Sequence, residues 1–309
     1  MEIRTTKGSS LKILVVRFRA IGDCVMTAYP VTAIRQHVPD AHITWATEPE
    51  NQPVIDLHHL VNHVAVFPRK AWKRRRWSPQ AWREQLQTHL NLRKERFDVG
   101  FDFQGHTKTA LCLRIAAPKL RFSVPGTDPF ARLINPASCQ YPATTHEIER
   151  KMLCLRAWAD LRVPDQPIMP ELNLPQLPQR LITIQTGASR EDKRVPQESI
   201  AQLGAKLLAE GYSVALLGGP EDPHVELPGA IDLVGKTTLL ESMAWIRGSL
   251  IHVAGDTGTG HIAAAYGVPT LSVFVSLRNP PERYLPLGAD LILGANASEI
   301  HGAIQTKLA

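Results

Sequence analysis

Short apolar runs alternate along this chain with longer stretches of mixed polar and apolar residues. We expect the runs to be buried strands and the mixed stretches to be helices, because such alternation is typical of a parallel sheet covered on both faces. The expected strands cover 11–18, 41–47, 61–68, 97–105, 119–124, 181–187, 213–219, 231–235, 250–256 and 270–275. Helices are expected within 20–39, 106–117, 197–211, 238–249 and 260–267.

The alternation stops once, at residues 163–180, where five prolines occur with little periodicity. This composition indicates a linker between domains. A chain of 309 residues also exceeds what one core usually spans. The fold class is therefore α/β, with two Rossmann-like, doubly wound domains, 1–170 and 171–309, facing a central cleft.

Composition narrows the class of protein. Hydrophobic residues make up 44% and charged residues 21%, as in a soluble globular enzyme. The four cysteines are far apart and form no CxxC pair, which argues against a zinc site and favours a reducing compartment. No apolar run is long enough to span a membrane and no targeting signal is evident, so we expect a cytoplasmic protein.

Positive charge is concentrated in the first half of the chain. Residues 1–175 hold 25 Lys and Arg against 16 Asp and Glu, whereas residues 176–309 hold 10 against 13. Tryptophans interrupt the densest run, within 67–85, whose cations include Arg69, Lys73, Arg74, Arg75 and Arg76. This run is a solvated loop, a nucleic-acid patch or a surface for an anionic acceptor at a membrane. Lys108 and Arg121 would extend such an acceptor surface, and Gln104 is expected to be a further acceptor contact.

Several polar residues lie just past the ends of expected strands, where ligands bind in parallel sheets. They are Asp23, Gln104, Thr186 and Asp256. Asp23 is either the N-cap of the following helix or a general base on the floor of the cleft, and one residue can do both.

Two loops in the second half have the composition of phosphate sites. In "QTGASREDKRVP" (185–196), Thr186, Ser189 and backbone amides could surround phosphate oxygens, and Lys193 could neutralise them; otherwise this is a solvated loop. In "AGDTGTGHIAAAYGVPTLSVF" (254–274), the amides of 257–261 open a helix and would face an anion. His261 is a phosphate ligand or a capping residue there, and Asp256 holds the loop backbone or reaches a sugar hydroxyl. "VGKTT" (234–238) lacks the glycine spacing of a P-loop.

The motifs together resemble glycosyltransferase family 9, the ADP-heptose:lipopolysaccharide heptosyltransferases, most closely the heptosyltransferase I branch. The resemblance rests on the opening "ILVVRFRAIGDCVMTAYPVTAIRQHVPDAHITW", on "FDVGFDFQGHTKTALC", and on "TGASREDKRVP", "LLGGPED" and the 254–274 loop in that order. One departure is Val195, where the family usually has Trp or Phe.

This resemblance implies a GT-B fold, with the acceptor bound by the N-terminal domain and the ADP-sugar donor by the C-terminal one. It implies an inverting transfer of heptose to the Kdo and inner-core region of lipopolysaccharide, with no metal and no cofactor. Asp23 matches the catalytic aspartate and Lys193 the diphosphate lysine. The implied donor contacts are Ser189, Glu221, Asp256, Thr257, Gly258 and His261.

Two other functions remain open. Another GT-B nucleotide-sugar enzyme, such as an epimerase, would share the fold and the phosphate loops. A nucleic-acid-binding protein would account for the basic run but would leave Asp23 and the 254–274 loop without a role. We expect no nucleic-acid partner, a monomer, and peripheral contact with the cytoplasmic face of the inner membrane.

Overall fold

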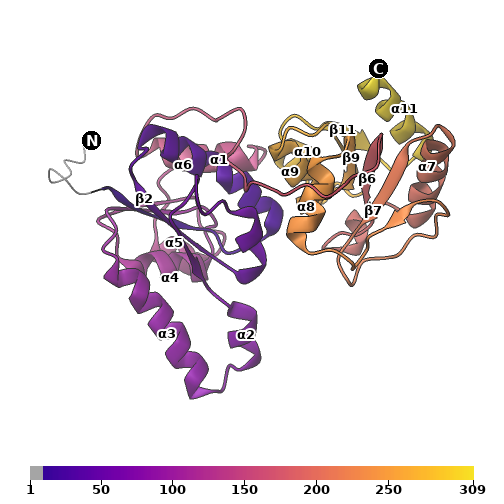
Figure 1. The fold of residues 1–309 in the computed structure, drawn as a ribbon. Coiled ribbons are helices and arrows are strands. Elements are labelled where there is room, and N and C mark those ends of the chain that lie inside the picture. The colour runs from indigo at the N-terminus through magenta and orange to yellow at the C-terminus, as the bar shows by residue number, and fades with distance from the viewer. Residues whose placement is uncertain (1–9) are drawn as a thin grey trace. The chain divides into compact units, whose positions relative to one another are not determined.

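The computed structural model describes residues 10–309, and the chain divides between Pro170 and Glu171 into two compact units. Figure 1 shows each unit as a sheet with helices around it. We call them the N-terminal and the C-terminal unit. Residues 163–180 contain no helix or strand. Which unit binds which substrate remains a prediction.

The N-terminal unit is built on a five-stranded, fully parallel sheet with the strand order β3-β2-β1-β4-β5. Its strands are β1 (Lys12–Val16), β2 (His42–Thr47), β3 (His63–Val66), β4 (Val99–Asp102) and β5 (Leu120–Ser123). The order reverses beside β1, so the carboxyl ends of β1 and β4 lie next to each other at the switch point of the sheet, where ligands bind in open α/β sheets.

Helices cover both faces of this sheet (Figure 1), with α1 and α6 on one face and α4 and α5 on the other. The helices of the unit are α1 (Ile21–His37), η1 (Pro49–Val54), α2 (Arg69–Arg74), α3 (Pro79–Lys94), α4 (Thr107–Ala116), α5 (Pro129–Ile134) and α6 (Glu147–Arg156).

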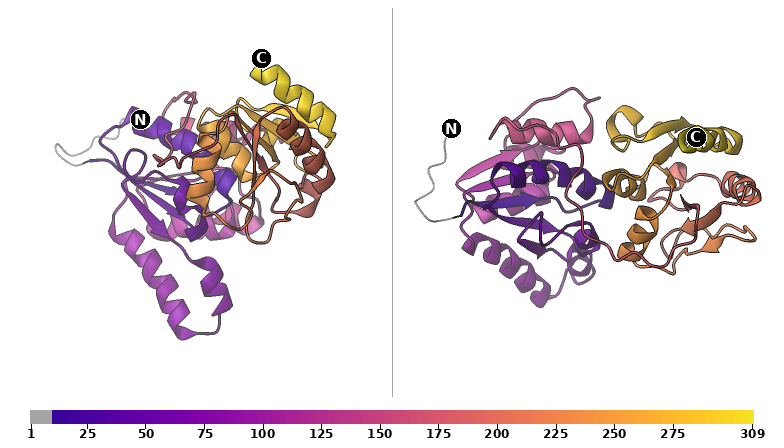
Figure 2. Two further views of the ribbon diagram at one scale, coloured as in Figure 1. Left: turned by 45° about the vertical axis from the view of Figure 1, so that its right-hand side comes forward. Right: turned by 45° about the horizontal axis from the view of Figure 1, so that its top comes forward.

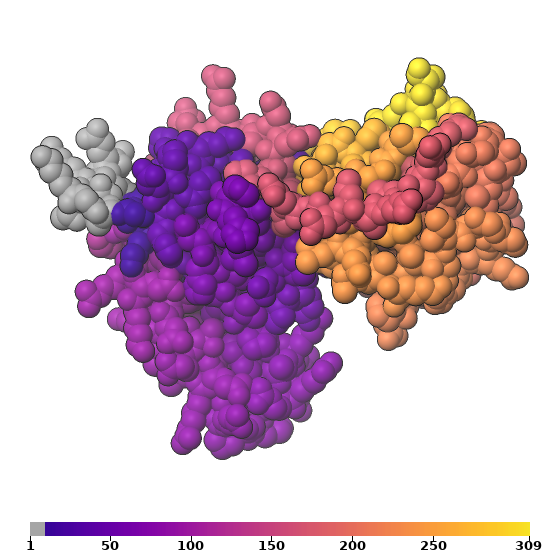
Figure 3. Space-filling model, in the orientation of Figure 1, coloured from indigo at the N-terminus to yellow at the C-terminus, as the bar shows by residue number. Residues whose placement is uncertain are grey.

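The segment after β3 differs from the solvated loop that was one interpretation of its sequence. It forms two helices, α2 and α3, joined by a short turn. They extend away from the sheet of the N-terminal unit, as the left view in Figure 2 and the space-filling view of Figure 3 show. We call residues 69–94 the basic hairpin.

The C-terminal unit is built on a six-stranded parallel sheet with the order β11-β10-β9-β6-β7-β8. Its strands are β6 (Leu181–Gln185), β7 (Ser213–Leu217), β8 (Ile231–Asp232), β9 (Ile251–Gly255), β10 (Thr270–Phe274) and β11 (Asp290–Leu293). Its helices are η2 (Glu191–Lys193), α7 (Gln197–Ala209), α8 (Leu239–Arg247), α9 (Gly258–Ala265), α10 (Pro281–Tyr284) and α11 (Ala297–Leu308). The sequence-based prediction of an α/β protein with two parallel sheets is confirmed, although it missed β11.

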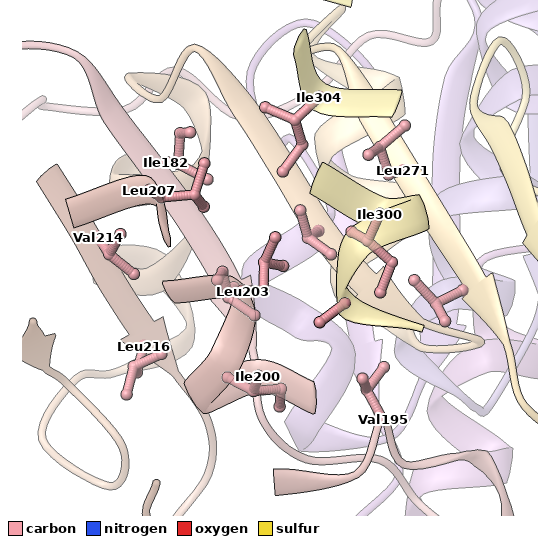
Figure 4. Close-up of a cluster of buried hydrophobic side chains, with 14 of the residues drawn as sticks. Ile182, Val195, Ile200, Leu203, Leu207, Val214, Leu216, Leu271, Ile300 and Ile304 are labelled. Atoms are coloured by element: carbon pink, nitrogen blue, oxygen red, sulfur yellow. The ribbon is translucent and has the colours of Figure 1, made fainter. Parts of the chain in front are cut away.

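The core of the C-terminal unit packs α7 and α11 against one face of the sheet (Figure 4). Leu203 and Leu207 of α7 meet Ile300 and Ile304 of α11 there, and all four are at most 1% exposed. Burying each such side chain contributes about 1.5–3 kcal/mol. Val195 is also buried in this cluster, so the departure from the family's usual aromatic residue leaves a packed core.

His252 places a titratable ring in the middle of this sheet. It lies on β9, is fully buried, and its Nδ1 is 2.9 Å from the Thr183 hydroxyl on β6. Burial lowers the pKa of His252 to about 3, so the native state holds the neutral ring. An unfolded chain would bind a proton near pH 6.5. The unfolded state therefore binds more protons between pH 6.5 and 3, and acid in that window destabilises the fold.

We predict that the C-terminal unit loses about 1.4 kcal/mol of stability between pH 7.5 and pH 5.5 through His252 alone. Amide hydrogen exchange of β6, β9 and β10 measures this loss. His252→Asn has no titrating group at this position, so the loss of stability between pH 7.5 and pH 5.5 that exchange measures should be smaller in this variant by about 1.4 kcal/mol. An unchanged pH dependence in the variant would contradict the assignment.

Candidate active site

Asp23 lies in the first turn of α1, at the carboxyl edge of the N-terminal sheet. The N-cap of α1 is Ala20, so Asp23 is the third helical residue and not the cap itself. Its Oδ2 accepts the Ala20 N–H at 3.3 Å, and its Oδ1 lies 2.6 Å from Nη2 of Arg17. Burial favours the neutral carboxyl, but the charges of Arg17 and Lys151 outweigh it and lower the pKa of Asp23. The side chain keeps 27% of its surface exposed, which leaves room for a ligand.

Several cations gather at the same edge of the N-terminal sheet. Arg69, at the start of α2, lies 2.6 Å from Glu48 and 5.1 Å from the centre of the Phe18 ring. The positive charge of Arg69, followed by burial and by Lys73 and Arg19, lowers the pKa of Lys108. Sequence reasoning predicted Arg69, Lys73 and Lys108 as acceptor contacts, and the structure brings these three close together. It missed Arg19, which lies three positions after the end of β1.

The other arginines of the run 69–76 differ from one another in their contacts. Arg75 forms a two-pronged ion pair with Glu84, with Nη2 2.7 Å from Oε2. Arg74 and Arg76 instead line an open surface pocket together with Lys70, Lys73 and Trp77. The run 69–76 is therefore not one surface: Arg69 faces the sheet edge, Arg75 is paired, and Arg74 and Arg76 lie at the pocket. Lys73 belongs to both groups.

Two further predicted acceptor residues are placed differently. The Oε1 atom of Gln104 accepts the Phe18 N–H at 2.8 Å, which ties the end of β4 to the end of β1. Arg121 is exposed in the middle of β5, at the opposite side of the sheet from β3. Burial, followed by the charge of Arg114, lowers the pKa of Arg121. The cationic neighbour of Arg121 is therefore on α4 and not in the basic hairpin. The Oε1 atom of Gln104 forms a hydrogen bond within the fold.

In the C-terminal unit, an ion pair joins the two loops that sequence analysis predicted to bind phosphate. Nζ of Lys193, at the end of η2, lies 2.7 Å from Oδ2 of Asp256, which follows β9. The same oxygen accepts a hydrogen bond from Nδ2 of Asn279 at 2.7 Å. Both members of the ion pair are nearly buried, at 11% and 10% exposure. Asp256 thus holds Lys193 in place. Neither of the two roles predicted for Asp256 included this ion pair.

The helix α9 begins beside this ion pair. Thr257 is its N-cap and Gly258 its first residue, so the first amides of the helix have no partner within the helix. The hydroxyls of Thr257 and Thr259 lie 3.0 Å apart, and His261 is buried one turn further on. The positive end of the helix dipole and the Lys193 ammonium both favour an anion here.

The other predicted donor residues differ in exposure. Ser189 and Glu221 are exposed on loops at the carboxyl edge of the sheet. Thr186 is fully buried, and its hydroxyl donates to the Leu217 carbonyl oxygen at 3.2 Å. Its geometry does not fit the predicted phosphate contact, because the hydroxyl joins β6 to β7 within the fold. Asp222, which sequence reasoning missed, accepts the Gly219 N–H at 2.8 Å and holds the loop that carries Glu221.

Close packing requires glycine at one position behind the ion pair. A Cβ atom on Gly255 would lie 2.6 Å from the backbone oxygen of Lys193, closer than real atoms approach. The absence of a side chain at Gly255 therefore lets the Lys193 loop lie against the end of β9. Residues 10–309 contain no cluster of three or more His, Cys, Asp or Glu side chains arranged to hold a metal ion.

Two parallel sheets, one of them with the start of a helix beside a nearly buried lysine, are typical of α/β enzymes that bind phosphorylated ligands. The family model for glycosyltransferase family 9 (heptosyltransferase) matches residues 85–299. The chain belongs to this family, and it is therefore a glycosyltransferase. Asp23 and Arg17 lie before the matched segment.

Individual relatives agree with this family. Lipopolysaccharide heptosyltransferase 1 of Pseudomonas aeruginosa is 23% identical over 281 residues, which cover 85% of this chain and 78% of that protein. Its counterpart in Escherichia coli K12 is 22% identical over 85% of this chain and 88% of that protein. The structure of E. coli heptosyltransferase WaaC with ADP superposes with a TM-score of 0.82 at 20% identity, covering 96% of this chain and all of that chain. The predicted GT-B fold class is thereby confirmed.

We predict that Gly255→Ala weakens ADP binding by about tenfold or more, equivalent to about 1.4 kcal/mol, because Lys193 must move. Isothermal titration calorimetry measures the Kd. Gly302→Ala is the matched control: it lies in α11 with nothing within 4 Å of an added Cβ atom, so ADP binding should not change. Equal affinities for both variants would show that Lys193 and β9 do not form a nucleotide site.

Proposed function

We propose that this protein transfers heptose from ADP-heptose to the Kdo and inner-core region of lipopolysaccharide, with inversion at the anomeric carbon. Family membership and the similarity to lipopolysaccharide heptosyltransferases 1 support this substrate pair. The observation that carries the proposal is Lys193, held by Asp256 beside the start of α9, because its ammonium and the first amides of that helix are hydrogen-bond donors suited to diphosphate oxygens.

The donor diphosphate binds at the start of α9 in this proposal. Lys193 neutralises its charge, and the amides from Thr257 onward donate hydrogen bonds to its oxygens, with His261 beneath them. Ser189 and Glu221 contribute from the neighbouring loops, with Glu221 directed at the ribose. Asp256 acts through Lys193, since its carboxylate already binds the ammonium at 2.7 Å.

The reaction forms one bond and breaks one bond. The acceptor hydroxyl oxygen attacks the anomeric carbon from the face opposite the diphosphate, and the bond from that carbon to the phosphate oxygen breaks. ADP leaves with the bonding electron pair. The hydroxyl proton passes to the Asp23 carboxylate, which is ionised because its pKa is lowered.

No metal is required in this proposal. The negative charge that grows on the leaving ADP needs an opposite charge in place before the reaction. Lys193 and the α9 amides supply that charge from fixed positions.

We predict that activity persists in excess EDTA. Lys193→Ala should raise the KM for ADP-heptose and also lower kcat, because the leaving group gains charge in the transition state. Steady-state kinetics measure both effects. Loss of activity in EDTA that Mg²⁺ or Mn²⁺ restores would contradict the role given to Lys193.

A second prediction concerns Asp23. Asp23→Asn preserves the shape but removes the base, so transfer should fall by about 10²–10⁴-fold. The Kd for ADP should stay the same, because the proposed donor contacts are in the C-terminal unit. Turnover near that of the wild type would exclude Asp23 as the base.

We further propose that the protein acts as a monomer at the cytoplasmic face of the inner membrane, where the basic hairpin meets the anionic lipid acceptor. No helix within residues 10–309 has the length and apolar character needed to cross a bilayer. Trp82, Leu86 and Leu90 follow one another at one-turn spacing on α3 and are 63%, 58% and 38% exposed. Trp77, 85% exposed, lies beside the pocket that Arg74 and Arg76 line. Exposed aromatic and cationic side chains together suit a membrane interface, where each cation contributes about 1 kcal/mol.

Two hairpin variants separate charge from apolar contact. Arg74→Ser with Arg76→Ser should weaken sedimentation with anionic vesicles and reduce its salt dependence. Trp82→Ser with Leu86→Ser should weaken sedimentation while keeping the salt dependence. Neither variant should change the Kd for ADP. If both variants sediment like the wild type, the hairpin is not the membrane surface.

A further inference from the structure

Arg17 is fixed at the carboxyl edge of the N-terminal sheet, where β1 and β4 end. It directly follows β1, and its Nη1 donates to the carbonyl oxygen of Phe103, just after β4, at 2.8 Å. Its side chain is only 9% exposed. A planar guanidinium bonded on one side to the backbone has little freedom to turn, so its opposite side points in a defined direction.

That opposite side faces Asp23. Nη2 of Arg17 lies 2.6 Å from Oδ1, while the Ala20 N–H donates to Oδ2 at 3.3 Å. These two donors, one on each oxygen, define the plane of the carboxylate. Each oxygen has a second lone pair, so the carboxylate can still accept a hydrogen bond from a substrate hydroxyl.

The charges around Asp23 come from three elements. Arg17 faces it from the end of β1, Cys24 from its own helix, and Glu147 and Lys151 from α6, which packs against α1. Burial raises the pKa of the Cys24 thiol to about 12, so this group is neutral. Lys151 is itself paired with Glu147, whose Oε2 lies 3.1 Å away. Burial raises the pKa of Asp23, and the charge of Arg17 is the largest of the influences that lower it.

We propose that Arg17 is a positioning residue for the transfer reaction, which aims the Asp23 carboxylate and keeps it ionised; this rests on the role of Asp23 proposed above. A carboxylate so held is a weak base. It suffices because the acceptor hydroxyl becomes acidic as its oxygen bonds to the anomeric carbon, and the base must then be charged and in place.

A purely structural ion pair would also join β1 to α1, and the pH profile of kcat/KM separates the two roles. In Arg17→Met, the acid limb of the profile should move up by about 1–3 pH units, since an adjacent opposite charge lowers a carboxyl pKa by that amount. Arg17→Lys keeps the charge but loses the planar fork. In Arg17→Lys, the acid limb should return most of the way to its pH position in the wild type, while the plateau value of kcat/KM stays below that of the wild type.

The matched control is Arg162→Met, which removes an exposed arginine elsewhere in the same unit and should leave the profile unchanged. An acid limb in Arg17→Met that coincides with that of the wild type would overturn the proposal. So would an equal loss of activity in Arg17→Met and Arg17→Lys with no shift in either.

A second measurement does not depend on activity. The titration of the Asp23 carboxyl can be followed by carbon-13 NMR in the wild type and in Arg17→Gln. The midpoint should lie below that of a free aspartate in the wild type and rise in the variant. A wild-type midpoint above the free value would overturn the proposal even if no Arg17 variant folds. If the wild type transfers no heptose, the proposed function fails, while this titration still decides the role of Arg17.

Discussion

The carboxyl edge of a parallel sheet gathers the ends of all its strands, and here it also gathers charges that burial would otherwise penalise. In each unit a short ion pair at this edge includes a candidate site residue. In the N-terminal unit Arg17 binds Asp23, and in the C-terminal unit Lys193 binds Asp256. Removing one member of such a pair is destabilising, because the other charge is left without a partner. The two pairs therefore fix the positions of the groups that the proposed chemistry needs.

The two pairs have opposite arrangements. In the N-terminal unit the cation is anchored to backbone and the carboxylate keeps an exposed side. In the C-terminal unit the carboxylate is held by Asn279 as well, and the partly exposed start of α9 lies beside the cation. A negatively charged acceptor and a diphosphate donor are both compatible with this division, with a carboxylate available in the N-terminal unit and a cation in the C-terminal unit.

Local sequence patterns were sufficient to predict the strands that end at the site, because apolar runs and the polar residue after each run depend on local chemistry alone. Asp23, Lys193 and the start of α9 were predicted as parts of the site on this basis. The partners of these residues were not predictable, since Arg17–Asp23 joins a strand end to a helix and Lys193–Asp256 joins segments 63 positions apart. The partners of Thr186 and Gln104 were missed for the same reason, because they are backbone groups 31 and 86 positions away along the chain. The strand β11 was missed because it is short and two of its three apolar residues are exposed.

The basic hairpin shows where composition is ambiguous. Its density of cations fits a loop, a nucleic-acid patch or a lipid surface equally well. Only the structure separates Arg69, which faces the sheet edge, from Arg74 and Arg76 beside Trp77. The exposed row on α3 adds an apolar component, which a bilayer would cover and a nucleic acid would not.

The most direct test of the central claim offers the purified protein a panel of nucleotide sugars together with Kdo-lipid A and analyses the products by mass spectrometry. The account predicts that the acceptor gains one heptose, that ADP is released, and that only ADP-heptose serves as an efficient donor. Transfer from a different nucleotide sugar in preference to ADP-heptose would contradict this account, as would release of free sugar in the absence of acceptor.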